Sequence, residues 1–226
     1  MYSITLKHTP EEKVWFTSDL HLGHDKEFVW KARGFNSVGE MNETIIKNLK
    51  ACVGAEDHLY ILGDLCFGPN AEARTWLEQI PGKVTVIVGN HDTDSRLALY
   101  EELGFKVMFA ARMRYGKYHF FLSHYQTLTE NSGEDYLTNA HINLYGHTHQ
   151  NWIWTPEYPH SYCVCPEANN CFPHEINEII AHLRTMLQLE RFKKAMKNIG
   201  ITAKEASEAM TELAAAMKDS IEEIED

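Results

Sequence analysis

Five short polar motifs in this chain have residue types that could hold metal ions. In chain order they are Asp-x-His, Gly-Asp, Gly-Asn-His-Asp, a lone His and Gly-His-x-His. Carboxylates, imidazoles and amide oxygens are ligands that divalent metals take in proteins. Two such ions about 3.5–4 Å apart lower the pKa of a bridging water and clamp phosphoryl oxygens, as phosphate-ester cleavage requires. The motif residues are Asp19, His21, Asp64, Asn90, His91, Asp92, His124, His147 and His149.

Each motif follows an apolar run that predicts a β-strand. Val84–Val88 is β-branched and lacks alternation, so it predicts a strand buried on both faces that ends at Gly89. Helical patterns at 38–51 and 70–80, the second capped by Asn70, alternate with the first strands. This alternation predicts a largely parallel sheet with its polar loops along one edge. The other strand-like runs are 14–17, 59–62, 118–122 and 142–145.

Residue spacing indicates how one loop could supply two ligands. In an extended segment, residues two apart point to the same side, so Asp19 and His21 would face one cavity. The two histidines of the last motif have the same spacing. Asn90 and His91 are adjacent and should diverge, which leaves His91 to face a substrate.

The order of the motifs resembles that of the calcineurin-like metallophosphoesterase superfamily, over roughly residues 14–175. The resemblance implies an α/β fold, a four-layer αββα sandwich of two mixed β-sheets flanked by helices. It also implies two divalent metal ions, with Mn²⁺ as the first expectation and Fe, Zn, Ni or Mg as alternatives. The implied ligands are Asp19, His21, Asp64 and His149 for the first ion, and Asp64, Asn90, His124 and His147 for the second.

The same resemblance implies roles for four further residues. His91 would lie near the leaving group as a general acid or transition-state stabiliser. Asp92 would orient His91 and raise its basicity; the alternative is that Asp92 caps the next helix. His24 and Arg33 would contact substrate phosphate, because residues 18–35 resemble a small bacterial and phage branch of the superfamily. Their alternatives are a solvated histidine and a surface arginine.

The second half of the chain has a different strand pattern. Residues 2–7 alternate and predict an edge strand, and 105–114 with 118–123 predict a hairpin. Further strands are expected near 152–154 and 161–164. A mixed pattern with an antiparallel second half fits two packed sheets.

The C-terminal part predicts a helical extension. A helical pattern begins after Pro173 and breaks at 198–200, and a second helix from about 202 has apolar residues at steps of four and three. We expect a phosphoesterase domain at 1–185 and an extension at 186–226. The extension would form a helical hairpin; the alternative is that it makes a homodimer or docks a partner.

Composition restricts the partners. The 226-residue chain has a net charge of −11, which argues against a broad grip on duplex nucleic acid, although a local basic groove is compatible with it. A small phosphate ester or nucleotide is the expected substrate. No apolar run approaches a membrane span, and the N-terminal residues lack a secretory pattern. With five cysteines expected to be reduced, we expect a cytoplasmic protein without a membrane partner.

The activity implied by the resemblance is hydrolysis of a phosphodiester or small nucleotide by attack of a metal-bridging hydroxide. A phosphomonoesterase or nucleotide pyrophosphatase is an alternative, because these reactions share the ligand set. A non-catalytic scaffold acting through the C-terminal helices is another, and the presence of His91 argues against it. The remaining histidines, among them His8 and His58, fall outside the pattern and receive no role.

Overall fold

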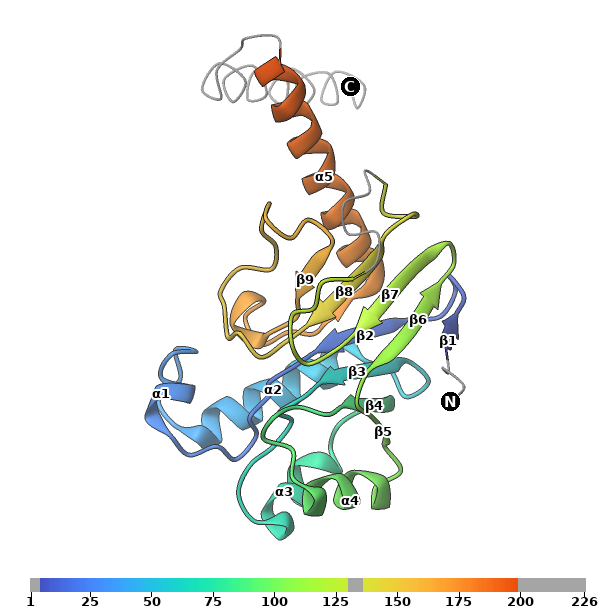
Figure 1. Cartoon of the computed structure of the whole chain (residues 1–226). Helices are drawn as coiled ribbons and strands as arrows, with labels where there is room; N and C mark the ends of the chain where they lie inside the picture. The colour runs from blue at the N-terminus through green and yellow to red at the C-terminus, as the bar shows by residue number, and fades with distance from the viewer. Residues whose placement is uncertain (1–4, 130–135, 199–226) are drawn as a thin grey trace, which may run out of the picture. The chain divides into compact units, whose positions relative to one another are not determined.

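The computed structural model describes residues 5–129 and 136–198. The chain divides into two compact units, Met1–Leu183 and Arg184–Asp226, and the described part of the second is the end of one helix. Whether the boundary predicted after residue 185 separates two folding domains stays a prediction. The first unit contains two five-stranded sheets and the helices that flank them (Figure 1).

The first sheet has the strand order β10-β2-β3-β4-β5. Its strands β2 to β5 pair with one another in parallel, and the short β10 pairs with β2 in the antiparallel direction at the edge of the sheet. Parallel pairing places the carboxyl ends of these strands along one edge of the sheet, as the alternation of strands and helices predicts. The strands are β2 (Val14–Thr17), β3 (His58–Leu62), β4 (Lys83–Ile87), β5 (Lys106–Met108) and β10 (His174–Glu175).

Helices cover one face of this sheet. In α2, Ile45 and Leu49 are buried and belong to one apolar core with Leu59 and Ile61 of β3. The Ser37 hydroxyl accepts the first-turn N–H of Glu40 at 3.1 Å and so caps α2. The helices that contribute to this core are α1 (Glu27–Trp30), α2 (Val38–Cys52), α3 (Asn70–Leu77) and α4 (Asp94–Glu102). A further helix, α5 (Ile176–Asn198), follows β10.

The second sheet has the strand order β1-β6-β7-β8-β9. Along β6, Ala111, Met113 and Tyr115 are buried, whereas Arg112 and Arg114 are exposed, so one face packs inward and the other is open to solvent. A 3₁₀ turn, η1 (Pro166–Ala168), follows β9. The strands are β1 (Thr5–His8), β6 (Ala111–Tyr115), β7 (Tyr118–Leu122), β8 (His141–Tyr145) and β9 (Ser161–Cys163).

The predicted fold class is confirmed, since two mixed sheets are flanked by helices, but several details are wrong. Only β6 and β7 are antiparallel in the second sheet; the other three pairings are parallel. The run 105–114 is two strands, β5 and β6, which belong to different sheets. Residues 152–154 form no strand. Local alternation does not reveal which sheet a strand joins, because partners come from distant parts of the chain.

Two predictions concern helix ends. Asn70 is not a cap: it is the first residue of α3 after the cap residue Pro69, and its amide donates to the Ser95 hydroxyl at 2.9 Å. The second helix of the predicted C-terminal hairpin falls outside the described residues. Within residues 5–129 and 136–198, no helix combines the length and apolar character needed to cross a bilayer.

Leu59→Ala should test the contribution of the core between the first sheet and α2. Leu59 is fully buried, so we expect the free energy of unfolding to fall by about 2–5 kcal/mol. Leu128→Ala is the matched control, because this leucine is 75% exposed and should change stability by less than about 0.5 kcal/mol. Urea denaturation measures both, and equal effects would contradict the proposed core.

Candidate metal centre

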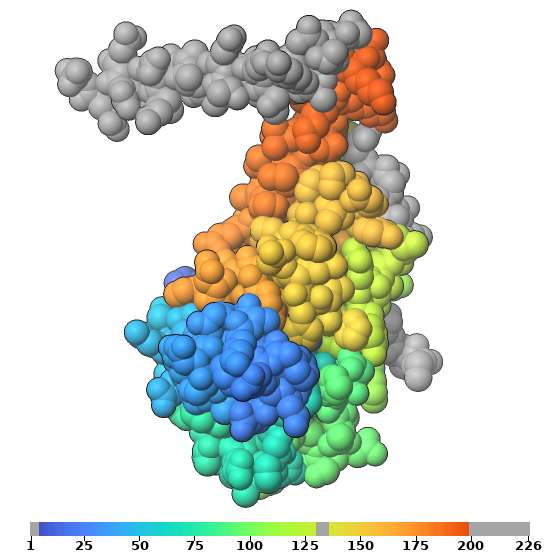
Figure 2. All heavy atoms as spheres, turned by 90° about the vertical axis from the view of Figure 1, so that its left-hand side faces the viewer, coloured from blue at the N-terminus to red at the C-terminus, as the bar shows by residue number. Residues whose placement is uncertain are grey.

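The predicted loops meet at the carboxyl ends of β2, β3, β4, β7 and β8. Figure 2 shows the surface on the side of α1, where the N-terminal segments in blue lie beside the segment around residues 140–160 in yellow. Four backbone hydrogen bonds join the loops after β2 and β3, among them Asp19 N–H to the Gly63 carbonyl at 2.9 Å and His21 N–H to the Asp64 carbonyl at 3.1 Å. The pairing of the two strands therefore continues into their loops.

Five of the predicted ligands have a left-handed backbone. Their φ angles are between 45° and 66°, a conformation that costs a residue with a side chain about 1–3 kcal/mol. The expectation that these segments are extended is wrong, because the left-handed turn, and not strand alternation, directs the side chains inward. Such strain is characteristic of functional sites. The five residues are Asp19, His21, Asp64, His147 and His149.

Asp19, His21 and His149 form the first ligand group. Asp19 Oδ1 lies 4.0 Å from His21 Nε2 and 3.7 Å from His149 Nε2. Asp19 Oδ1 and His21 Nε2 are buried and have no hydrogen-bond partner, which is costly unless something satisfies them. Burial, with the neighbouring His149 and Arg33, lowers the pKa of His21 to about 2, so its ring is neutral and keeps the lone pair that a metal needs.

Asp64 and His124 form a second group with Asp19. His124 Nε2 lies 3.7 Å from Asp64 Oδ2 and 2.8 Å from the Asn90 amide oxygen. His124 Nδ1 is 2.8 Å from the Leu62 carbonyl, which only accepts, so Nδ1 bears the hydrogen. In the neutral ring Nε2 then has a lone pair, which faces the Asn90 amide oxygen, another acceptor. Two acceptors so close are stabilised by a cation between or beside them.

His147 lies next to this second group. Its backbone N–H donates to Asp19 Oδ2 at 2.8 Å, and its ring packs edge-on against His124 and Tyr125, with centroids 5.0 and 4.6 Å away. Gly146, just before it, has no room for a side chain, because a Cβ there would overlap the Asp19 carboxylate. Gly89 is restricted in the same way by Asp64. These glycines are needed for close approach.

His91 lies at the open side of the centre. Its side chain is 52% exposed, and its Nε2 is 4.0 Å from Asp64 Oδ2. Its backbone N–H donates to the other oxygen, Asp64 Oδ1, at 2.9 Å. The side chain is thus near the ligand groups and accessible to a bound molecule.

Asp92 has a different position from either predicted one. Its Oδ2 accepts the backbone N–H groups of Asp64 at 3.1 Å and Gly89 at 2.8 Å, and its Oδ1 accepts the Tyr100 hydroxyl at 2.8 Å. The cap residue of α4 is Thr93. Asp92 therefore ties the loop after β4 to the loop after β3, and the expected role of orienting the His91 ring is corrected to positioning Asp64.

Arg33 and His24, the expected substrate contacts, both lie behind ligands. The Arg33 side chain is 1% exposed, and it donates to the carbonyls of Asp19 at 2.7 Å and Leu20 at 3.0 Å. His24 Nδ1 is 2.9 Å from His21 Nδ1, so it orients that ring. The geometry favours positioning roles for both, and contact with substrate stays a prediction.

Sequence reasoning missed Glu167, which connects Arg33 to His149. Its Oε1 accepts from Arg33 Nε and from His149 Nδ1, each at 2.8 Å. Burial lowers the pKa of His149, but the Glu167 hydrogen bond and the Asp19 charge raise it further than burial lowers it. Burial also opposes ionisation of Glu167, and His149 and Arg33 outweigh it, so its pKa is about 2. Glu167 lies in a 3₁₀ turn outside every motif, so the sequence offered no signal for it.

Eight of the nine motif residues therefore lie around one polar centre, and Asp92 lies behind it. The lone pairs of this centre fit divalent cations. Over residues 13–158 the chain matches the family model described as the calcineurin-like phosphoesterase superfamily domain. The chain belongs to this superfamily. The predicted membership is confirmed, and the family supports a metal-dependent phosphoric ester hydrolase in general terms.

Relatives of the chain come from two phages and an archaeon. Gene 66 proteins of Mycobacterium phages L5 and D29 are 30% and 32% identical over 62% of this chain and 79% and 80% of their own lengths. An uncharacterized protein of Methanocaldococcus jannaschii is 37% identical over 42% of this chain; the match spans 56% of that protein's length. The phage relatives support the predicted phage and bacterial branch.

A solved structure supports the fold. A protein of unknown function from Aquifex aeolicus superposes with a TM-score of 0.58 at 23% identity, covering 76% of this chain and 99% of the other. At this identity the likeness concerns the fold alone.

Glu167→Gln should weaken metal binding, because it removes the charge that orients His149. Loss of such an outer contact typically lowers metal affinity about 10–100-fold. Glu157→Gln is the matched control, since Glu157 is exposed and should leave affinity unchanged. Titration of the metal-free protein with Mn²⁺ measures both variants. Equal affinities for Glu167→Gln and the parent would show that this carboxylate does not support the centre.

Proposed function

We propose that this protein is a dinuclear-metal-dependent phosphoesterase that hydrolyses a phosphodiester or a small nucleotide, with Mn²⁺ as its metal. The observation that carries the proposal is the pair of ligand groups that share Asp19, with buried lone pairs left unsatisfied between them. The proposed ligands are those named from the sequence: Asp19, His21, Asp64 and His149 for one ion, and Asp64, Asn90, His124 and His147 for the other.

Each group of residues would have its own role in the reaction. Bound at these ligands, two cations would supply an activated water and neutralise charge on the phosphoryl oxygens. His91, half-exposed beside Asp64, would hold a proton at Nε2 for the departing oxygen. Arg33 and Glu167 would keep the first ligand loop and His149 in place through their mutual hydrogen bond.

Hydrolysis of bis-p-nitrophenyl phosphate and of p-nitrophenyl phosphate with Mn²⁺ tests the proposal. We expect turnover of the diester that is lost in Asp64→Asn, because Asp64 is a proposed ligand of both ions. His91→Ala should keep the metals and lower kcat about 10²–10⁴-fold, as loss of a general acid does. His182→Ala, a substitution of a histidine on α5, is the control with unchanged turnover.

The outcomes separate the alternatives. Turnover of the monoester alone would contradict the diesterase proposal in favour of a phosphomonoesterase. Turnover of neither substrate, with both metals bound, would contradict catalysis on simple esters and favour a scaffold or a nucleotide pyrophosphatase, which hydrolysis of a dinucleoside polyphosphate would distinguish.

A second candidate, a nuclease that acts on single strands, is favoured by a cavity on the open face of the second sheet. It has a volume of about 430 Å³, and none of its described lining residues is acidic. Strand register places Lys7 opposite Arg114, Arg114 opposite His119, and His119 opposite His141. Like charges in adjacent strands are unfavourable, so the pair of Lys7 and Arg114 favours an anionic occupant.

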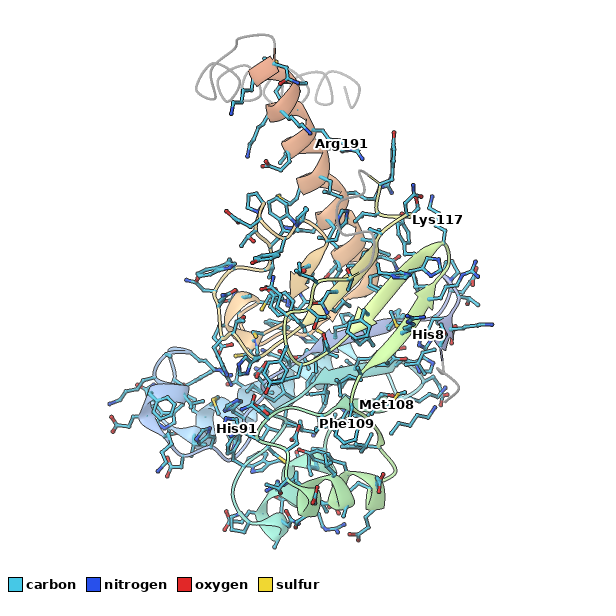
Figure 3. The ribbon with its side chains drawn as sticks, in the orientation of Figure 1. His8, His91, Met108, Phe109, Lys117 and Arg191 are labelled. Carbon is cyan, nitrogen blue, oxygen red and sulfur yellow. The ribbon has the colours of Figure 1, made fainter. Side chains whose placement is uncertain are left out.

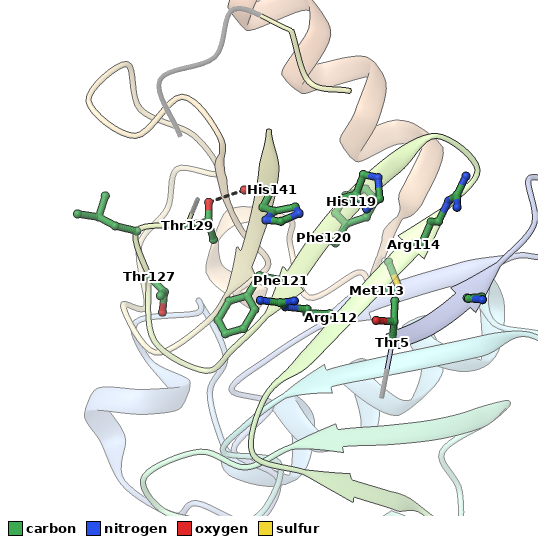
Figure 4. Close-up of a pocket in the computed structure, with 12 residues that line it drawn as sticks. Thr5, Arg112, Met113, Arg114, His119, Phe120, Phe121, Thr127, Thr129 and His141 are labelled. Carbon is green, nitrogen blue, oxygen red and sulfur yellow. Dashed lines mark hydrogen bonds between the residues drawn. The ribbon is translucent and has the colours of Figure 1, made fainter. Parts of the chain in front are cut away.

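An aromatic ring lies beside another cation of this face. Arg112 pairs with Phe121 across β6 and β7 (Figure 4), a combination that suits the phosphates and bases of a single strand. The cavity also includes Thr127, which lies on the loop that follows His124. This end of the cavity is therefore three residues along the chain from the proposed ligand His124.

Arg112→Ala should raise KM for a single-stranded oligonucleotide severalfold and reduce the salt dependence of KM by about one phosphate contact. Hydrolysis of the small chromogenic diester should be unchanged, because that substrate does not reach the sheet face. Arg74→Ala, on α3, is the matched arginine control. Equal KM values for the oligonucleotide in the parent and Arg112→Ala would rule out this face as a nucleic-acid contact.

A further inference from the structure

A second cluster of metal-ligand residues lies away from the candidate metal centre. It consists of His8 at the end of β1, Glu12 in the turn that follows, and His58 at the start of β3. A strand rises about 3.3 Å per residue, so the length of β3, from His58 to Leu62, separates the cluster from the loop of Asp64 by about 13 Å. Figure 3 shows His8 and His91 on opposite sides of the first unit.

The distances in this cluster fit tetrahedral coordination. Glu12 Oε1 lies 3.5 Å from His8 Nδ1 and 3.3 Å from His58 Nε2. Ligand atoms 2.0–2.1 Å from a tetrahedral zinc ion are about 3.3 Å from one another. A direct charge-assisted hydrogen bond would instead bring nitrogen and oxygen to about 2.7–2.9 Å. Both distances from Glu12 Oε1 therefore have the spacing of ligands around a common ion, and the ligand atoms of all three residues lie within 4.8 Å of one another.

Two of the three ligands are oriented by further hydrogen bonds. His8 Nε2 lies 2.6 Å from the buried Tyr60 hydroxyl, and the Thr9 N–H donates to Glu12 Oε2 at 2.6 Å. These contacts leave His8 Nδ1 and Glu12 Oε1 directed toward the cluster, as outer contacts do in metal sites.

We propose that His8, Glu12 and His58 form a binding site for one Zn²⁺ ion, with a fourth position open to water. The side chains of Glu12 and His58 are 39% and 26% exposed, so solvent has access to the ion. β1 and β3 belong to different sheets, and a shared ion would therefore link the two sheets at the end opposite the candidate metal centre. The proposal is independent of the proposed function.

Zinc content in an Asp64→Asn background provides the test, because this substitution disables the other centre and leaves the cluster unchanged. The metal-free full chain is dialysed against Zn²⁺, and bound zinc is measured by atomic emission. Adding His58→Ala should lower bound zinc by one equivalent per chain, and adding Glu12→Gln should weaken the affinity at least tenfold. His182→Ala is the matched histidine control and should change neither value.

Thermal unfolding gives a second readout that does not depend on activity. Zinc at about a hundredfold excess over its Kd should raise the Tm of the Asp64→Asn protein by about 5 °C or more, and this shift should vanish with Glu12→Gln. Glu12 is partly exposed, so this variant is expected to fold even if His58→Ala does not. Equal zinc content and equal Tm shifts with and without the cluster substitutions would overturn the proposal.

Discussion

The structure depends on the burial of two carboxylates at the ends of parallel strands. Asp19 and Asp64 are 0% and 2% exposed, and a buried charge is tolerated only when it is paired or coordinates a metal. Each has one oxygen satisfied by a backbone N–H, from His147 and His91 respectively. The other oxygens face imidazole nitrogens at 3.7–4.0 Å. Cations are the partners that would satisfy both sets of lone pairs.

This requirement explains the unusual backbone around the carboxylates. Left-handed turns at residues with side chains are unfavourable, yet five occur at proposed ligands. Contacts from other elements hold them in place. Arg33 donates hydrogen bonds to the carbonyls of Asp19 and Leu20, and Asp92 accepts them from the N–H groups of Asp64 and Gly89. The strain is thus compensated by side chains that themselves touch neither proposed ion.

Charge is distributed unevenly over this acidic chain. The net charge of −11 would repel a phosphate ester in bulk solution. The ligand loops counter it locally through the proposed cations, and the open face of the second sheet does so through Lys7, Arg112 and Arg114. Net charge alone therefore gave an incomplete expectation of the anions that this chain could bind.

The sequence by itself determined the strands, the ligand types and the family. Apolar runs before each motif predicted β2, β3, β4, β7 and β8, because burial selects β-branched and aromatic residues at strand positions. Parallel alternation then placed the motif loops at one edge. These features are local in the chain, or follow from the order of the elements, and a single sequence contains that information.

Tertiary structure decided how the side chains are held. The role of Glu167 and the buried position of Arg33 depend on a contact between residues far apart in sequence, and no local pattern records it. The same holds for His8 and His58, which are 50 residues apart in sequence. Their rings meet only because the end of β1 lies beside the start of β3. Residue types can be recognised along the chain, but the distances that make them ligands or supports exist only after packing.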